Sequence, residues 1–276
     1  MIERLATALE LARKGYWTLF AAKTLRTLRL HAVLDRLTCR VTIPGELSIR
    51  PLRLHVELGD VISDDICRYG EWEPVLSRRI LAHAHRGGVL VDIGANIGYF
   101  SLLWAAAGPS NRVHAVEAAP RVFRKLVRNV RLNRLESRIR TYEVALSDRE
   151  GVSAFEPGPE EQTGWGGLVD TSTVGAIEVA TTRLDTLFAD LPRIDVLKID
   201  VEGADMRVLR GGERLLRDRR IGTIYFEEII DRMAALGIAP GDAAAFLESC
   251  GYSVSRVVDP RYEGDGRITE WQAVPR

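Results

Sequence analysis

The chain has 276 residues, 46% of them hydrophobic, which is enough for one large α/β domain with a well-packed core. Its 38 Lys and Arg balance 38 Asp and Glu, and this argues against a dedicated nucleic-acid binder, because such proteins carry a basic excess. The three cysteines lie far apart without metal-binding spacing. We therefore expect no disulfide framework and a location in the reducing cytoplasm.

Residues 1–37 show apolar side chains at helical spacing, interrupted by basic residues before they reach a membrane-spanning length. We expect no secretory signal and no membrane span. Residues 1–40 hold eight Lys and Arg against three acids. This pattern favours a helical lid or an oligomerisation arm over a membrane-surface helix, and it makes a homodimer plausible. We divide the chain into an N-terminal extension (1–60), with short strands in 41–58, and a main domain (61–276).

Short apolar runs alternate with helical stretches from residue 89 onward. The alternation predicts a mostly parallel sheet covered by helices on both faces, with an antiparallel hairpin of the last two strands at one edge. A polar, glycine-rich stretch predicts a loop at 156–176. The expected strands are 89–94, 112–118, 139–146, 195–200, 223–228, 253–258 and 268–274. The first expected helix follows strand 89–94 and ends near residue 107, and the others are 120–133, 204–218 and 240–250.

A glycine-containing turn, Asp92 to Gly98, follows the first of these strands and opens a helix. Such a turn brings bare backbone against a ligand at the carboxyl end of the sheet. The turn is not GxGxxG, and the chain has no GxxxxGK[ST], so the dinucleotide and P-loop fingerprints are both absent. Asp92 would repel a pyrophosphate, but it can accept a hydrogen bond from an α-ammonium group.

Glu117 ends the second strand, where a carboxylate can accept both hydroxyls of a ribose. Together with the glycine turn it indicates an adenosine ligand without phosphates, namely S-adenosylmethionine. The alternative is that Gly94 and Gly98 serve only tight strand–helix packing, and that Glu117 is a solvated strand end.

Five segments, VDIGANIGYFSL, VHAVEAAP, ALSDREG, TTRLDTL and LKIDVEGADMRVLRGGERLL, occur in this order and resemble the FkbM-type methyltransferases over roughly residues 60–230. The resemblance implies a class I methyltransferase (Rossmann-like) fold with a seven-stranded sheet. It also implies S-adenosylmethionine as the donor and O-methylation of sugars or polyketide-like natural products. The cofactor contacts that we expect are Glu71, Asp92, Gly94, Asn96, Gly98, Glu117, Ala118, Glu143 and Ala145. Glu143 is equally well explained as a surface acid, whereas for Glu71 we favour an exposed loop acid over a cofactor contact.

Methyl transfer to a hydroxyl requires in-line positioning and removal of the acceptor's proton. Asp200, Glu202 and Glu227 stand at strand ends and are the catalytic candidates, as a base and its partners. Three converging carboxylates are also a potential divalent-metal site, which we do not favour. Alternatively, Glu202 serves only to stabilise a helix N-terminus.

Trp165, flanked by glycines in a polar loop, is a candidate cap over the acceptor, although a packing role is equally compatible with the sequence. The five histidines form no recognisable catalytic pattern. Alternative functions are N-methylation of an amine or macromolecule and a non-catalytic S-adenosylmethionine-binding module. The fourth strand lacks the [DN]PPY of nucleic-acid amino-methyltransferases. A nicotinamide-dependent oxidoreductase is disfavoured because GxGxxG is absent. We expect a hydroxylated small molecule as acceptor.

Overall fold

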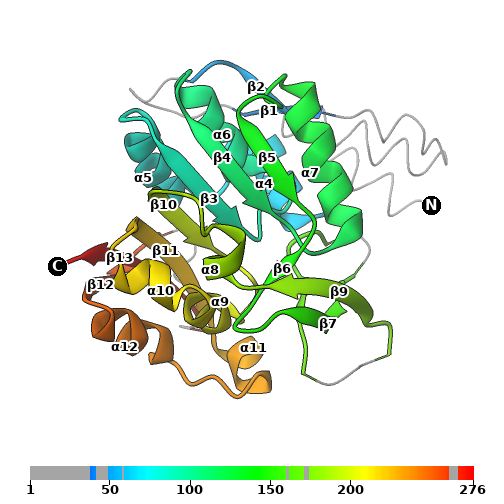
Figure 1. Ribbon diagram of the computed structural model, residues 1–276. Helices are drawn as coiled ribbons and strands as arrows, with labels where there is room; N and C mark the ends of the chain where they lie inside the picture. Colours follow the sequence, from blue (N-terminus) through cyan, green and yellow to red (C-terminus); the bar gives the residue numbers. More distant parts are fainter. Residues whose placement is uncertain (1–37, 42–48, 58, 160–161, 171–173, 261–266) are drawn as a thin grey trace.

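The computed structural model describes residues 38–41, 49–57, 59–159, 162–170, 174–260 and 267–276 (Figure 1). The N-terminal stretch 1–37, for which we predicted a helical lid or arm, lies outside the described residues.

A seven-stranded sheet forms the centre of the molecule, in the order β12-β13-β11-β10-β3-β4-β5. Strands β11, β10, β3, β4 and β5 run parallel, whereas β13 is antiparallel to both of its neighbours. The predicted fold class, a mostly parallel sheet with an antiparallel hairpin at one edge, is confirmed. The strands are β3 (Val89–Ile93), β4 (Arg112–Val116), β5 (Ile139–Tyr142), β10 (Ile194–Ile199), β11 (Ile221–Ile229), β12 (Tyr252–Val257) and β13 (Ile268–Pro275).

Helices cover both faces of this sheet (Figure 1). Alternate residues of a strand point to opposite faces, so Leu90 packs in one buried cluster and Val91 in the other. Short apolar strands buried on both sides are typical of a parallel sheet. One face carries α5 (Pro74–Ala84), α6 (Tyr99–Ala107) and α7 (Pro120–Leu132), and the other carries α8 (Leu184–Leu187), α9 (Asp205–Gly211), α10 (Glu213–Arg217) and α12 (Asp242–Ser249).

Two predicted elements are interrupted in the structure. The helix predicted over 204–218 breaks at Gly212, where a Cβ would lie 2.4 Å from the Leu184 side chain. The strand predicted over 139–146 divides after Tyr142, because Ala145 and Leu146 pair with a different sheet. That four-stranded sheet has the order β6-β9-β7-β8 and extends into the predicted loop. It consists of β6 (Ala145–Leu146), β7 (Gly151–Glu156), β8 (Gly167–Leu168) and β9 (Ile177–Thr182).

A short antiparallel hairpin precedes the main sheet, with β1 at Thr38–Val41 and β2 at Leu52–His55. Its backbone is tied to α7, because the Asn133 side chain bonds the N–H and C=O of Arg53 at 3.0 and 2.7 Å. Leu52 and Leu54 share a buried cluster with α6. Residues on both sides of the proposed domain boundary at residue 60 therefore pack in the same buried cluster. The division into two domains stays a prediction.

The sequence led us to expect no disulfide framework, and the structure has one disulfide bond, which that expectation did not include. Cys39 of β1 is bonded to Cys67 of α4 (Val61–Tyr69), and their Cα atoms are 5.4 Å apart across 28 residues of sequence. The hairpin folds back onto α4, a contact that cysteine spacing does not reveal. Disulfides persist mainly in oxidising compartments, so this bond counts against the predicted cytoplasmic location. Cys250 is buried and free.

Within the described part of the chain, no helix is both long and apolar enough to cross a membrane.

Candidate active site

A cavity of about 530 Å³ opens at the carboxyl ends of the parallel strands. Residues that follow β3, β4, β10 and β11 line its floor, because parallel strands end at the same edge of a sheet. The start of α4, residues 162–168 and α11 (Ile230–Ala235) form its walls. Ligands of open α/β sheets bind at this position, so the cavity is the candidate active site.

The glycine turn after β3 depends on Gly94 for a backbone reason. Gly94 has φ +73°, and a Cβ there would lie 1.8 Å from the Asp200 carbonyl oxygen. The Asp200 N–H also donates to the Ile93 carbonyl at 3.0 Å, so the ends of β3 and β10 are held together. Gly94 lines the cavity. Gly98 does not, and its missing Cβ leaves room for Leu126 of α7. Gly98 is therefore explained by tight packing between the turn and α7.

Glu117 and Asn96 form a pair at the cavity wall. One carboxylate oxygen of Glu117 accepts the Asn96 N–H at 2.9 Å, and the other accepts the Ala119 N–H at 2.8 Å. These bonds fix the carboxyl group, and each oxygen keeps a lone pair free for a ligand hydroxyl. Burial raises the pKa of Glu117 to about 7 despite both amides. Oδ1 of Asn96 is buried without a hydrogen-bond donor among the described residues, so it is a second acceptor at this wall.

An apolar slot lies next to Glu117. Its lining consists of Ala118, Val144, Ala145 and Leu146, at or near the ends of neighbouring strands, and of Phe155 in β7. These side chains suit a planar, uncharged ring. Of the two residues expected here, Ala145 is in the lining, whereas Glu143 is exposed and is not.

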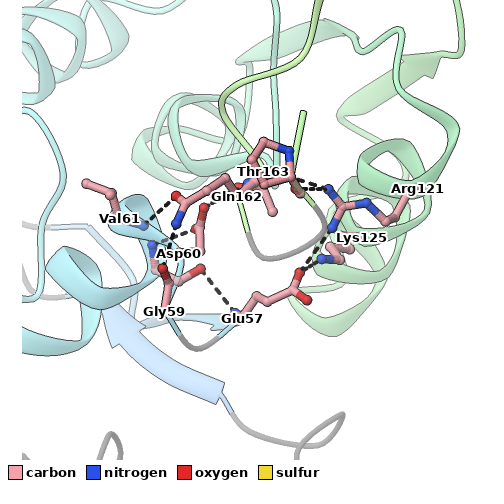
Figure 2. A network of polar contacts seen from close by, with 10 residues as sticks. Glu57, Gly59, Asp60, Val61, Arg121, Lys125, Gln162 and Thr163 are labelled. Carbon is pink, nitrogen blue, oxygen red and sulfur yellow. Dashed lines mark hydrogen bonds and ion pairs between the residues drawn. The ribbon is translucent and has the colours of Figure 1, made fainter. Parts of the chain in front are cut away.

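Polar contacts join three distant parts of the chain into a clasp, which consists of Glu57 with residues 59–63, of Pro159, Gln162 and Thr163, and of the first turns of α7 (Figure 2). Oδ1 of Asp60 accepts the Thr163 N–H at 2.9 Å and its hydroxyl at 3.0 Å, and Oδ2 caps α4 through the Ser63 N–H at 3.0 Å. Gln162 bonds the backbone of Gly59 and Val61.

Helix α7 contributes two basic side chains to the clasp. Arg121 donates to the carbonyls of Pro159 and Gln162 at 3.1 and 3.2 Å, and Glu57 pairs with Arg121 and Lys125 (Figure 2). Asp60, Gln162 and Thr163 all line the cavity, so the clasp forms one of its walls.

Replacing Asp60 with Ala should lower the free energy of unfolding by about 1–3 kcal/mol, because it removes a helix cap and two buried hydrogen bonds. Urea unfolding measures this loss. The matched control is Asp190→Ala, since Asp190 is exposed and makes no side-chain contact with the described residues. Equal stability of the two variants would contradict the structural role of the clasp.

The three catalytic candidates converge at the strand ends, as expected. Asp200, Glu202 and Glu227 all line the cavity. Burial, followed by repulsion from Asp200, raises the pKa of Glu202 to about 8 and that of Glu227 well above its ordinary value. Asp205 lies behind them and accepts the backbone N–H groups of Val201 and Glu227 at 3.4 and 3.1 Å. It therefore positions both strand ends.

Two further acids belong to this cluster and were not predicted. Glu73, at the start of α5, lines the cavity with a left-handed backbone (φ 42°), which is unfavourable for a residue with a Cβ. Glu270 of β13 stands directly opposite Glu227 in the strand register. Burial and the neighbouring carboxylates raise the pKa of Glu73 well above its ordinary value and that of Glu270 to about 7. Within Glu71-Trp72-Glu73, the sequence alone did not indicate which acid faces inward.

Lys198 holds the floor of the cluster. Its Nζ lies 3.0 Å from Asp200 and 3.9 Å from Asp92, and its side chain is 3% exposed. Asp92 also accepts the Ser101 hydroxyl at 2.6 Å. We expected Asp92 to contact the ligand, but it is fully buried beneath the turn and does not line the cavity.

Replacing Glu227 with Gln should stabilise the protein at pH 8. The pKa of Glu227 is raised in the folded state, so its favourable contribution is complete below about pH 4.5 and is lost as pH rises through the folded value. A neutral amide avoids that loss, so we expect Glu227→Gln to have a higher free energy of unfolding than the wild type at pH 8. Chemical unfolding at pH 5 and pH 8 measures the difference.

The gain should shrink towards pH 5, and the exposed Glu136→Gln should show no comparable change. A stability difference between Glu227→Gln and the wild type that does not vary with pH would contradict the raised pKa of Glu227 in the folded protein.

Trp165 lies at the mouth of the cavity with 49% of its surface exposed. Its carbonyl accepts Arg232 of α11 at 3.0 Å. Arg232 also lies 3.8 Å from Glu202 and 3.6 Å from Glu156, so it joins the tryptophan loop to the acidic cluster. This arrangement is compatible with the expected contact to an acceptor.

The remaining candidates lie elsewhere. Glu71 is 2% exposed, pairs with Arg78 at 3.4 Å and does not line the cavity. His114 bonds the Tyr142 hydroxyl at 2.7 Å, as a satisfied interior histidine does. No histidine is in the cavity lining among the described residues.

The cavity fits the chemistry of S-adenosylmethionine. Glu117 offers acceptors for two hydroxyls, the orphaned Asn96 oxygen offers one for an ammonium or hydroxyl group, and the adjacent slot is apolar. Across the described ranges, no group of three or more His, Cys, Asp or Glu residues is arranged to hold a metal ion.

Comparison with known proteins identifies the family model described as Methyltransferase FkbM domain over residues 92–254. The chain is 29% identical over 211 residues to the 31-O-demethyl-FK506 methyltransferase FkbM of Streptomyces tacrolimicus, covering 64% of this chain and 77% of that one. It is 32% identical over 158 residues to the 2-O-methyltransferase NoeI of Sinorhizobium fredii (51% and 64%). It is 31% identical over 136 residues to the hexuronic acid methyltransferase AglP of Haloferax volcanii (49% and 54%).

Proposed function

Because the chain belongs to the FkbM methyltransferase family, we propose that it transfers the methyl group of S-adenosylmethionine to a hydroxyl oxygen of a small molecule, such as a sugar or a polyketide-like natural product. The names of two relatives, a 31-O-demethyl-FK506 methyltransferase and a 2-O-methyltransferase, support an oxygen acceptor. The observation that carries the proposal is the buried Glu117 carboxylate, fixed by two backbone amides beside an apolar slot.

In this proposal the cofactor end of the cavity consists of Gly94, Asn96, Glu117, Ala118 and Ala145. Glu117 binds the ribose hydroxyls, and Asn96 accepts from the methionine portion. The apolar slot receives the adenine. The clasp at Asp60 and Thr163 excludes water from one side.

When bound, S-adenosylmethionine supplies an already activated methyl group, so the protein has to contribute positioning and a site for the acceptor's proton. We assign that proton to Oδ1 of Asp200. Oδ2 of Asp200 accepts from Lys198 at 3.0 Å, which holds the carboxylate in place at the cavity wall and leaves Oδ1 to take the proton. Glu202 and Glu227 border the same space and, when protonated, donate hydrogen bonds to the acceptor's oxygen atoms.

The proposal is tested by incubating the protein with S-adenosylmethionine and a panel of hydroxylated sugars and polyketides, with matched amines alongside. Mass spectrometry detects products heavier by one methyl group. We expect alcohols to be methylated and amines carrying no hydroxyl to be inert. Methylation of the amines at nitrogen would overturn the oxygen assignment.

A further inference from the structure

The acceptor end of the cavity, where β10 and β11 finish, is lined by many more acidic than basic side chains. Its lining includes Glu73, Asp200, Glu202, Glu227 and Asp231. Among the described residues that line the cavity, Arg232 is the one lysine, arginine or histidine. A ligand entering here meets carboxyl groups on several sides.

The cations nearby are already paired with the protein's own groups. Arg232 lies 3.8 Å from Glu202, lies 3.6 Å from Glu156 and donates to the Trp165 carbonyl at 3.0 Å. Lys198 is 3% exposed beside Asp200 and Asp92, and it is not in the lining of this cavity. Both side chains already lie next to carboxylates of the protein, so an anionic group of a ligand would have to compete with these carboxylates.

Glu227 is a polar group directed into this space without a partner of its own. In the described part of the chain, no residue donates a hydrogen bond to its carboxyl group, and the strand register sets it opposite Glu270, a second acid. Repulsion between carboxylates on facing positions is unfavourable. A ligand that brings a hydroxyl or an ammonium group relieves it, whereas one that brings a carboxylate adds to it.

The rim of the cavity has a different character. Val61, Trp165 and Ile268 all line the cavity, and they are 48%, 49% and 52% exposed. Exposed apolar side chains around an opening favour a ligand with an apolar portion that remains near the mouth.

From this charge pattern and rim we infer that the acceptor is an uncharged or positively charged hydroxyl compound with an apolar portion, and that acceptors bearing carboxylate, phosphate or sulfate are excluded. The inference rests on the proposed function and narrows its substrate class. A bound S-adenosylmethionine brings one sulfonium charge, which offsets no more than one of the carboxylates. Hexuronic acid, which the name of the Haloferax relative specifies, is therefore expected to be a poor ligand of this chain.

The test measures binding to the protein saturated with S-adenosylhomocysteine, by calorimetry at pH 7.5. The probes are phenyl glucosaminide, phenyl glucoside and phenyl glucuronide, which share a ring and an apolar aglycone but carry positive, zero and negative charge. A second series, consisting of benzylamine, benzyl alcohol and benzoate, tests the same charge preference with ligands that contain no sugar. We expect the anion in each series to bind on the order of ten- to a hundredfold more weakly than its neutral analogue. This difference in affinity between the anionic and the neutral probe should become smaller at high salt, because salt screens charge.

Asp200→Asn should narrow the difference in affinity between neutral and anionic probes, whereas Glu136→Gln, an exposed acid outside the cavity, should leave it unchanged. Equal binding of glucuronide and glucoside would overturn the inference. So would the absence of binding by every probe to protein that does bind S-adenosylhomocysteine. Failure of S-adenosylhomocysteine itself to bind would instead overturn the proposed function, and the inference with it.

Discussion

Asp200→Asn is expected to lower the rate of methyl transfer by roughly 10²–10⁴, the usual contribution of a positioned general base. The asparagine keeps the shape of the side chain but cannot take the acceptor's proton. Lys198 retains Asp92 at 3.9 Å, so the floor of the cluster should survive the substitution. Single-turnover kinetics with an acceptor from the alcohol panel measures the loss, and titration with S-adenosylhomocysteine shows whether the cofactor end is intact.

The matched control is Asp231→Asn, which removes an acid from the same cavity lining. Asp231 is 72% exposed at the side chain and lies 3.4 Å from Arg267, so its loss should change the rate with a neutral acceptor by no more than a few-fold. Normal turnover by Asp200→Asn would remove Asp200 from the mechanism. A rate that recovers fully at high pH would also contradict its role as the base.

Glu117→Ala should weaken binding of S-adenosylhomocysteine by about 1–3 kcal/mol, or roughly 5- to 150-fold, the value of hydrogen bonds to a charged acceptor. Glu143→Ala is the matched control, because Glu143 also follows a parallel strand but is exposed outside the cavity. Calorimetry at pH 8 compares the two. Equal affinity of the two variants would refute the assignment of Glu117.

The same carboxylate predicts how binding varies with pH. The pKa of Glu117 is raised to about 7, and its ionised form is the better acceptor of ligand hydroxyls. Affinity should therefore fall as pH drops below about 7 and level off above it. Glu117→Gln should abolish this dependence, since an amide does not titrate in this range.

Local patterns in the sequence are sufficient for the main sheet and its ligand edge. The apolar runs that became β3, β4, β10 and β11 were predicted within a few residues, because strands buried on both faces need continuous hydrophobic side chains. The acids at the ends of these strands could be predicted as site residues, because parallel strands end at the same edge of the sheet. Glu117, Asp200, Glu202 and Glu227 are accordingly found in one cavity.

Features that depend on contacts between distant segments escaped prediction. Glu73 precedes a helix far from the strand ends in sequence, and Glu270 reaches the cluster only through the register of β13 on β11. The bond between Cys39 and Cys67 follows from a hairpin that folds back onto α4. The contact of Asp60 with Thr163 spans 103 residues. None of these residues lies in a pattern that indicates its partner.

Several resemblance-based expectations concerned residues that stand next to the cavity without entering it. Asp92 and Glu71 are buried and paired inside the protein, and Gly98 accommodates Leu126. A motif identifies a segment that approaches a ligand, but the backbone dihedral angles of the turn decide which of its side chains face the ligand. Within the glycine turn, Gly94 and Asn96 face inward, whereas Asp92 and Gly98 do not.

The most direct test of the account is a calorimetric titration of the wild-type protein with S-adenosylmethionine and S-adenosylhomocysteine, with NAD as the control and with and without Mg²⁺. We predict that both adenosyl ligands bind at one site per chain, with affinity that rises between pH 6 and pH 8, and that NAD gives no heat. Silence with both adenosyl ligands across this range, with and without the metal, would contradict it.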